Sequence, residues 1–290
     1  MARKVIIIFA VLMMFLGAGV FIYPVFSNLY YEKMEEDRAA YYDNLVREEI
    51  PAEEIDSQWE ECRKYNETLM NGPAILFDPF DGKQLDPTTL PYAALLNEQG
   101  DGTMGHIEIP AIDVDLMIYH GTTEEMLQKG VGHLMGTSLP VGGTGSHCVL
   151  SAHTGLGNRR MFTDLDQLVE GDIFYLHILD DTLAYQVDQI KVVEPNDSSD
   201  LRIDANEDYV TLVTCTPYGV NSHRLLVRGT RISYEKAKLI EEETSGRPSV
   251  WEDEYKDAAI TGIVIVIVMV DLVVLYKQLR KVQKRKGKKK

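Results

Sequence analysis

Two long apolar stretches lie near the two ends of the chain. The first, Val5–Phe26, has 22 residues without a charge, and the second, Ala258–Tyr276, has 19 residues with Asp271 as its one charge. A helix rises about 1.5 Å per residue, so either stretch can cross a hydrocarbon core of about 30 Å. The pattern predicts transmembrane helices at 5–26 and 258–276. For the first, a cleaved signal peptide is the alternative, although its apolar core is long and no clear small-x-small cleavage site follows.

Basic residues flank both stretches on the side toward the chain ends. Arg3 and Lys4 precede the first stretch, and nine Lys or Arg without an acidic residue occupy the tail 277–290 after the second. Positive charge beside a membrane span marks its cytoplasmic side. We therefore expect both termini in the cytoplasm, and residues 27–257 outside the cell membrane.

Two segments without β-like pattern follow the first stretch. Residues 27–71 are rich in Glu, Tyr, Asp and Ala and predict a helical arm, which Pro51 breaks into two pieces. Residues 72–103 hold four prolines and four glycines and predict a loop or an extended arm. We expect one stripe of the helical arm to pack against the domain that follows, formed by Tyr30, Tyr31, Met34, Ala39, Tyr41 and Tyr42.

Short β-like runs dominate residues 104–232. Turn-forming clusters such as PVGGTG and EPNDSSD separate these runs, and brief helices are expected at about 122–128 and 161–168. About seven short strands with few helices predict a mainly β domain, a barrel or a sandwich. The acidic residues 233–257 are expected to form a helical linker to the second apolar stretch.

The segment between the predicted spans is strongly acidic. Residues 27–257 hold 18 of the 29 basic residues and 44 of the 45 acidic ones, a net charge near −26 that the formal −16 of the whole chain hides. Nucleic-acid phosphates would be repelled, so no nucleic-acid partner is expected. The charge is compatible with cationic peptide partners, and it also keeps an exported domain soluble.

Three cysteines lie in this segment, and their odd number leaves at least one free thiol. No CxxC motif and no zinc-like Cys/His spacing occurs, so neither a metal nor a cofactor is expected. Cys148 lies inside an apolar strand and Cys62 in a charged helical segment. Cys215 ends the β-like run 209–214 and precedes a turn at 216–219. A thiol at a strand end can be accessible on a rigid backbone, which a nucleophile requires.

Arg224 opens the β-like run that follows this turn. If the two runs pair as antiparallel neighbours, Arg224 returns to the same end of the sheet as Cys215. A guanidinium there can hold a substrate carbonyl and the oxyanion formed from it, and it favours a thiolate. The alternative is an ion pair with a surface carboxylate, which we expect for Arg228 and Arg231.

His153 is the leading candidate for proton transfer among seven histidines. It follows the β-like run 148–152 and precedes Thr154 and Gly155, a strand-end setting similar to that of Cys215. His106 and His177 lie in or near strands and are expected to be structural.

These motifs together resemble the sortases of Gram-positive bacteria. TLVTC ends on Cys215, Arg224 follows nine residues later, and SAHTG places His153 62 residues upstream. The resemblance covers roughly residues 72–232 and implies an eight-stranded sortase β-barrel. It also implies that Cys215 is the nucleophile that forms an acyl-thioester, that His153 is the general acid/base, and that Arg224 stabilises substrate and oxyanion.

The run TCTPYGVNSHRLLVRG is most similar to class C, the pilin polymerases. A second span with a basic tail is typical of that class, as is an N-terminal lid, matched here by Asp78, Pro79 and Phe80. An Asp on a loop can pair with Arg224, and a nearby aromatic ring can cover the thiol until the loop opens. An ordinary turn is the alternative, because Asp86-Pro87 repeats the dipeptide nearby.

The resemblance implies a membrane-anchored cysteine transpeptidase with its catalytic domain outside the cell. Its expected partners are pilin subunits that carry a C-terminal LPxTG-type sorting signal and an acceptor lysine, which the enzyme joins by an isopeptide bond. Three alternatives remain: a class A-like sortase that anchors surface proteins to the cell wall, a surface cysteine protease, and a non-catalytic scaffold that docks pilins.

Overall fold

The structure is a computed structural model that divides into two compact units. It describes residues 2–70, 76–83, 91–154, 156 and 159–244, and individual positions between 260 and 278. One unit comprises Met1–Ser27 and Pro248–Lys290, and the other comprises Asn28–Arg247.

Both predicted membrane spans belong to the first unit. Most side chains of 5–26 and much of 258–276 lie outside the described residues, so the two spans stay predictions. Within the part of the chain that is described, no helix is long and apolar enough to cross a membrane.

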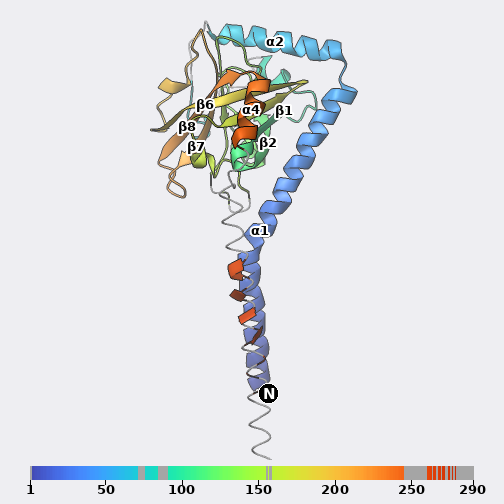
Figure 1. The fold of residues 1–290 in the computed structure, drawn as a ribbon, viewed down its shortest axis with the longest axis vertical. Coiled ribbons are helices and arrows are strands. Elements are labelled where there is room, and N and C mark those ends of the chain that lie inside the picture. The colour runs from blue at the N-terminus through green and yellow to red at the C-terminus, as the bar shows by residue number, and fades with distance from the viewer. Residues whose placement is uncertain are drawn as a thin grey trace, which may run out of the picture. The chain divides into compact units, whose positions relative to one another are not determined.

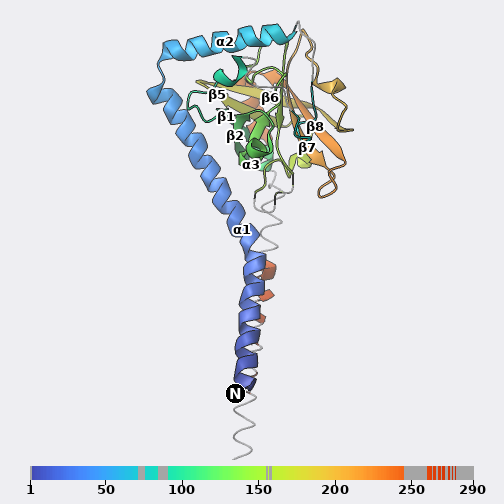
Figure 2. The ribbon, with the colours of Figure 1, turned by 180° about the vertical axis from the view of Figure 1, so that it is seen from behind.

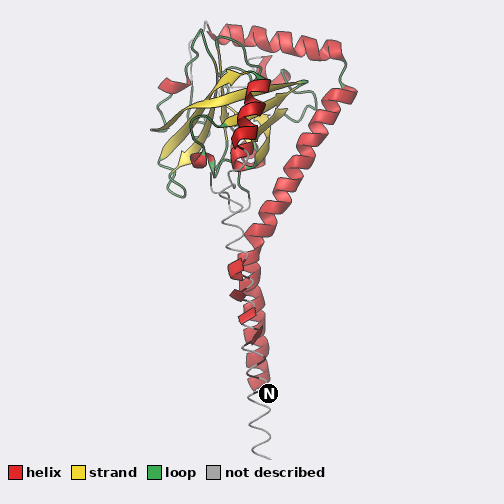
Figure 3. Ribbon diagram, viewed as in Figure 1, coloured by secondary structure: helices red, strands yellow, loops and turns green. Residues whose placement is uncertain are grey.

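The second unit is a closed eight-stranded barrel, drawn in yellow in Figure 3. Its strands follow the order β1-β2-β3-β4-β7-β8-β6-β5. The pairs β2–β3 and β4–β7 are parallel and the other pairs are antiparallel. Closure leaves no unpaired sheet edge and confirms the predicted mainly β barrel. The strands are β1 Thr103–Ile109, β2 Val114–His120, β3 Val131–His133, β4 Ser146–Ser151, β5 Ile173–Ile178, β6 Asp181–Val193, β7 Asp208–Thr216 and β8 His223–Ile232 (Figure 1).

Strand β4 is buried on both faces, and its alternating side chains separate two hydrophobic clusters. Cys148 and Leu150 belong to the large core cluster, and Val149 between them belongs to a smaller one. Successive strand residues point to opposite faces, so the smaller cluster lies on the other side of the sheet from the core. We call it the outer cluster; its buried members are Leu134, Val149, Leu201, Val213 and Leu226.

Two helices form the predicted arm. Helix α1 (Ala2–Glu49) ends just before Pro51, and α2 (Ala52–Met70) begins just after it. Two members of the predicted stripe, Ala39 and Tyr42, are buried in the core cluster, but Tyr30 and Tyr41 are 67% and 58% exposed. The helical period of 3.6 residues instead aligns a buried row against the core, formed by Ala39, Tyr42 and Val46.

The remaining helices are short. The predicted helix at 161–168 is only the 3-10 turn Leu165–Gln167, and Met161 at its predicted start has a left-handed φ of 49°. Helix α3 (Glu124–Lys129) packs against β2 and β3 (Figure 2). Helix α4 (Tyr234–Thr244) packs against β5 and β6. Three further 3-10 turns are η2 Pro91–Ala94, η3 Pro110–Ile112 and η5 Ser199–Leu201.

Polar contacts fix the arm to the barrel. The Tyr42 hydroxyl donates to the Met104 carbonyl (3.2 Å) and accepts from the Leu179 amide (3.0 Å). The Asn66 side chain donates to the Leu139 carbonyl (3.2 Å) and accepts from its amide (2.7 Å). Since α2 ends four residues after Asn66, these bonds also fix the point from which the chain proceeds to the lid segment.

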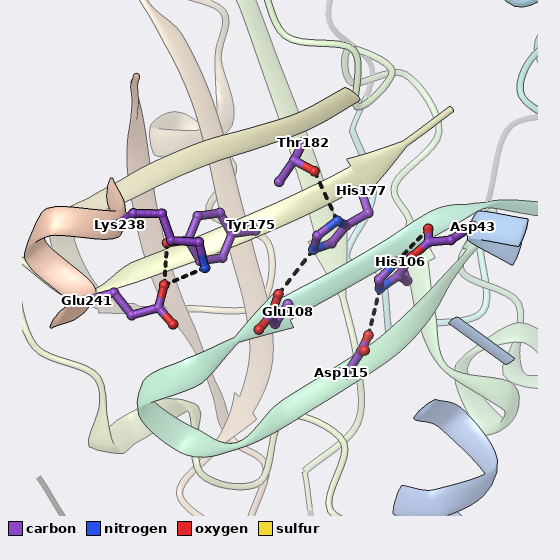
Figure 4. A network of polar contacts seen from close by, with 9 residues as sticks. All are labelled: Asp43, His106, Glu108, Asp115, Tyr175, His177, Thr182, Lys238 and Glu241. Atoms are coloured by element: carbon purple, nitrogen blue, oxygen red, sulfur yellow. Dashed lines mark hydrogen bonds and ion pairs between the residues drawn. The ribbon is translucent and has the colours of Figure 1, made fainter. Parts of the chain in front are cut away.

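A stacked pair of histidines connects α1 with three strands (Figure 4). The rings of His106 and His177 lie 4.2 Å apart and nearly parallel. His106 contacts Asp115 of β2 through Nδ1 (2.7 Å) and Asp43 of α1 through Nε2 (3.3 Å), while His177 Nε2 contacts Glu108 (3.1 Å). Burial by itself lowers the pKa of His106, but the two aspartates outweigh burial and raise it to about 9. His106 is therefore a cation at neutral pH that bridges the arm and the barrel.

The same network continues to α4. The hydroxyl of Tyr175 on β5 donates to Glu241 (2.7 Å), and Lys238 contacts the same carboxylate (2.9 Å). Both residues of α4 appear beside Tyr175 in Figure 4. The segment after the last strand is thus held on the barrel surface by a hydrogen bond from Tyr175 of β5 to Glu241.

Candidate active site

Three adjacent strands bring the candidate residues to one end of the barrel. Cys215 on β7 lies directly opposite Arg224 on β8 in the antiparallel register. Ser151, the last residue of β4, lies beside Val213 in the parallel register of β4 and β7. Continuing this register by two residues places His153 beside Cys215. The order β4-β7-β8 therefore aligns histidine, cysteine and arginine in a row.

Hydrogen bonds hold the backbone of His153 against β7. The Ala152 amide donates to the Val213 carbonyl (3.2 Å), and the Thr214 hydroxyl donates to the Ala152 carbonyl (2.8 Å). On its other side, the His153 carbonyl accepts from the Phe162 amide (3.1 Å). These bonds extend the β4–β7 pairing past the formal end of β4 and leave the His153 ring as the movable part.

Cys215 is a largely buried thiol beside a cation. It is 8% exposed, and burial raises its pKa; the charge of Arg224 acts in the opposite direction and that of Asp78 raises the pKa further. Cys62 and Cys148 are free and buried as well; burial raises the pKa of Cys62 to about 12 and that of Cys148 well above its ordinary value. Their thiols have no comparable cation opposite them on a strand.

Arg224 is fixed by two sets of hydrogen bonds. Its Nε and Nη2 donate to the two carboxylate oxygens of Asp78, at 2.8 and 2.5 Å. Its Nη1 donates to the carbonyls of Asn221 (3.1 Å) and His223 (2.9 Å) in the turn before β8. Both Arg224 and Asp78 are buried. By contrast, Arg228 pairs with the more exposed Asp188, as the sequence predicted, whereas Arg231 contacts the mostly buried Asp208.

The segment 76–83, which contains the predicted lid residues, packs against this row. The Phe80 ring lies 5.7 Å from the His153 ring and 5.1 Å from the Arg224 guanidinium carbon. Leu76 and Phe80 pack on the outer cluster, which provides the apolar seat of the lid. A pocket beside Arg224 separates the lid from residues 193–201. The Asp86-Pro87 repeat lies outside the described residues.

The other histidines are engaged elsewhere. His133 and His147 are buried, and burial lowers the pKa of each to about 4, so both are neutral structural residues. His120 contacts two backbone carbonyls, and His106 and His177 form the stacked pair. Among the described residues, no group of three or more potential ligands is arranged to hold a metal ion.

One residue near the row carries no signal in the sequence. Glu124, the first residue of α3, places Oε2 3.5 Å from Nε2 of His153. It precedes His153 by 29 positions in a solvated helix with no motif, so only the packing of α3 beside β3 reveals it.

Comparisons with known proteins agree with this geometry. Residues 107–232 match a family model described as a sortase domain. The structure is similar to Streptococcus pneumoniae Sortase C, at 47% identity and a TM-score of 0.62, covering 68% of this chain and 97% of that one. It is also similar to sortase C-1 from Actinomyces oris, at 46% identity and a TM-score of 0.58, covering 62% of this chain and 99% of that one.

Sortase D of Bacillus subtilis (strain 168) is 30% identical over 132 residues, which are 44% of this chain and 64% of that protein's length. An eight-stranded barrel with cysteine, histidine and arginine at the ends of β7, β4 and β8 defines a cysteine transpeptidase. The chain belongs to the sortase family, and the solved structures that it resembles are class C members.

Proposed function

We propose that this chain is a pilin-polymerising sortase that cleaves LPxTG-type sorting signals and joins the released carbonyl to a lysine of another pilin subunit. The observation that carries the proposal is the lid, in which Asp78 occupies Arg224 and Phe80 lies against both Arg224 and His153. Pilin substrate specificity is described for the Streptococcus pneumoniae sortase C, which is 47% identical to this chain.

The first step is acylation of Cys215. Its thiolate attacks the threonine carbonyl of the Thr–Gly bond, and Arg224 binds the oxyanion that develops on the carbonyl oxygen. Protonated His153 donates its proton to the glycine amine as the C–N bond breaks. A thioester between Cys215 and threonine remains, and the glycine-side peptide leaves as an amine.

The second step transfers the acyl group to an amine. Neutral His153 accepts a proton from a lysine ε-amine, and the nitrogen attacks the thioester carbonyl. The C–S bond breaks, the Cys215 thiolate leaves, and an isopeptide bond forms. Water can replace the amine, which gives slow hydrolysis.

The closed lid is incompatible with the first step. Nε and Nη2 of Arg224 already donate to Asp78, so these donors are unavailable to an oxyanion until the pair separates. Phe80 likewise covers His153. Lid opening therefore comes before acylation. Until then, the closed lid protects the thiol from water and from unsuitable peptides.

The proposal includes two membrane spans, at 5–26 and 258–276, with the barrel outside the cell. Its support is the apolar stretches and the basic residues that flank them. A sortase and substrates tethered to one membrane meet at a raised effective concentration.

The test is co-expression of the chain with a candidate pilin, followed by mass spectrometry for a Thr–Lys isopeptide. The proposal expects a ladder of pilin polymers with the wild-type chain and none with Cys215→Ala. Linkage to a cell-wall cross-bridge amine would favour the class A-like alternative, and hydrolysis that no amine can divert would favour a protease. Polymer ladders in the Cys215→Ala strain would refute the assignment of Cys215.

A further inference from the structure

Three polar atoms near His153 are buried and lack a hydrogen-bond partner among the described residues. They are the hydroxyl of Ser151, the hydroxyl of Thr122, and Nε2 of His153 itself. Ser151 is 0% and Thr122 is 3% exposed. Nearly all buried polar groups in proteins are hydrogen-bonded, so such a concentration beside a general acid/base calls for a further partner.

Strand pairing places Ser151 beside the segment that carries Thr122. Ser151 on β4 lies directly opposite Gly132 on β3, and the side chains of such a pair share one face of the sheet. Gly132 has no side chain, and a Cβ there would lie 2.5 Å from the Gly121 carbonyl oxygen, 3.0 Å from the Leu127 side chain and 3.3 Å from the Cα of Thr122. The Gly121–Thr122 backbone and Leu127 therefore fill the space above Gly132, which brings Thr122 into the neighbourhood of Ser151.

His153 shares this face. Ala152 belongs to the core cluster, so the residues on either side of it, Ser151 and His153, point away from the core. The Phe80 ring, which packs on the outer cluster, contacts His153 from the same side. Ser151 and His153 thus share the outer face of the sheet with Thr122 near Gly132, and the three give this face polar groups of which Ser151 and Thr122 are buried in this structure.

Glu124 completes this surface at its solvent side. Its Oε1 accepts from Gln128 (2.6 Å), which orients the carboxylate, and its Oε2 lies 3.5 Å from Nε2 of His153. The Glu124 side chain is 71% exposed. We define the α3-side cluster as four groups: Thr122, Glu124, Ser151 and Nε2 of His153. Its carboxylate is exposed to solvent and its two hydroxyls are buried.

The order of the strands determines which substrate group can reach this cluster. Arg224 binds the oxyanion on the β8 side of Cys215, whereas His153 lies on the β4 side. Because His153 protonates the leaving amine and deprotonates the entering one, both amines must lie on the β4 side. Beyond β4 in that direction comes β3, against which α3 packs, and Glu124 of the cluster is the first residue of α3.

We propose that the α3-side cluster receives the acceptor amine, a lysine ε-ammonium, after the lid has opened; this inference rests on the proposed function. An ammonium has three N–H donors and no acceptor, which the cluster complements with a carboxylate, two hydroxyl oxygens and an imidazole nitrogen. Glu124 attracts the cation from solvent, and the Ser151 and Thr122 hydroxyls accept two of its N–H bonds. The third proton passes to Nε2 of neutral His153, and the free amine then attacks the thioester.

The experiment separates attraction of a charged amine from general catalysis. Full-length chain in detergent micelles is acylated with a sorting-signal peptide, and the thioester is partitioned among water, a lysine peptide with a blocked N-terminus, and hydroxylamine. Hydroxylamine is uncharged at neutral pH. It attacks the thioester as lysine does, but it cannot form an ion pair with Glu124. Glu124→Gln is compared with Glu125→Gln, because Glu125 is also 71% exposed but pairs with Lys129.

With Glu124→Gln, we expect the ratio of lysine transfer to hydrolysis to fall about three- to fivefold, as for an exposed ion pair. The hydroxylamine ratio should equal that of wild type, and the lysine effect should shrink at high salt. Glu125→Gln should match wild type for both amines. The double variant Ser151→Ala, Thr122→Val should also lose lysine transfer selectively.

Three outcomes would overturn the inference. Equal losses for lysine and hydroxylamine would make Glu124 a positioning residue for His153. If the double variant lost only hydrolysis, the Ser151 and Thr122 hydroxyls would bind the attacking water instead of the lysine. Unchanged ratios of lysine transfer to hydrolysis in all variants would mean that the cluster has only a structural role. If the wild-type chain forms no thioester with any sorting peptide, the proposed function itself fails, and this is measured first.

Discussion

Asp78 and Arg224 form a buried, two-pronged ion pair between residues 146 positions apart in the chain. Both carboxylate oxygens of Asp78 accept from the guanidinium, through Nε at 2.8 Å and Nη2 at 2.5 Å. The pair joins the lid to the start of β8. It also occupies Nε and Nη2 of Arg224, the hydrogen-bond donors that the proposed reaction needs. Under the proposed function, this structure therefore corresponds to the state before substrate binds, and the ion pair would link lid position to the reactivity of Cys215.

Replacement of Asp78 by alanine should make Cys215 more reactive. The Asp78 charge raises the pKa of the thiol, so its removal lowers that pKa and increases the thiolate fraction at neutral pH. The rate of alkylation by iodoacetamide, measured from pH 6 to 10, should show its midpoint shifted to lower pH. Asp188→Ala is the matched control, because Asp188 makes the same two-pronged contact with Arg228 further along β8. Coincident profiles for wild type and Asp78→Ala would contradict the coupling.

Replacement of Arg224 by lysine should slow acylation by about 100-fold, the typical cost of losing one oxyanion donor. Lysine keeps the charge but lacks the planar fork that faces both the substrate oxygen and the Asn221 and His223 carbonyls. Single-turnover thioester formation with a sorting peptide measures the effect, with Arg228→Lys as the control. Wild-type acylation in Arg224→Lys would show that the arginine is merely structural.

Only Cys215 should be alkylated in the native protein. Cys62 and Cys148 are buried, and burial raises the pKa of both thiols, so neither presents a thiolate to the reagent. Peptide mapping after a short iodoacetamide pulse should find one modified site, and Phe80→Ala should accelerate that modification because its ring covers the row. Modification of Cys62 at a similar rate would mean that α2 leaves the barrel readily.

His106 should stabilise the fold in a pH-dependent manner. Its folded pKa, about 9, is raised above the unfolded value near 6.5, so its contribution is fully present below about pH 6.5 and is lost as pH rises through about 9. Protonation of His106 thus adds on the order of 3 kcal/mol to the free energy of unfolding at low pH, relative to pH values above 9. Urea midpoints of wild type and His106→Gln should therefore differ most near pH 6 and converge above pH 9. The control is His223→Gln, at a more exposed position; a constant difference across the pH range would rule out the charged bridge.

The sequence alone determined the features that depend on neighbouring residues. Cys215 ends one β-like run and Arg224 opens the next after a short turn, so antiparallel pairing brings them together with few alternatives. Pro51 similarly divides the helical arm, since it cannot continue an α-helix. The strand pattern was sufficient for a mainly β domain, and the combined motifs for the family.

Only the tertiary structure decided the contacts between distant segments. His153 reaches Cys215 through the parallel pairing of β4 and β7, whose register is set by packing across the whole barrel. The buried face of α1 and the shortened turn at 165–167 likewise follow from the barrel surface and from the backbone at Met161. Glu124 and Ser151 have no local signature, because Glu124 meets His153, 29 positions later, only where the folded chain returns, and the burial of Ser151 depends on the neighbouring strands. The members of the row and the pairing of Asp78 with Arg224 were thus predictable from the sequence, whereas the contact of Phe80 with His153 and the approach of Glu124 were not.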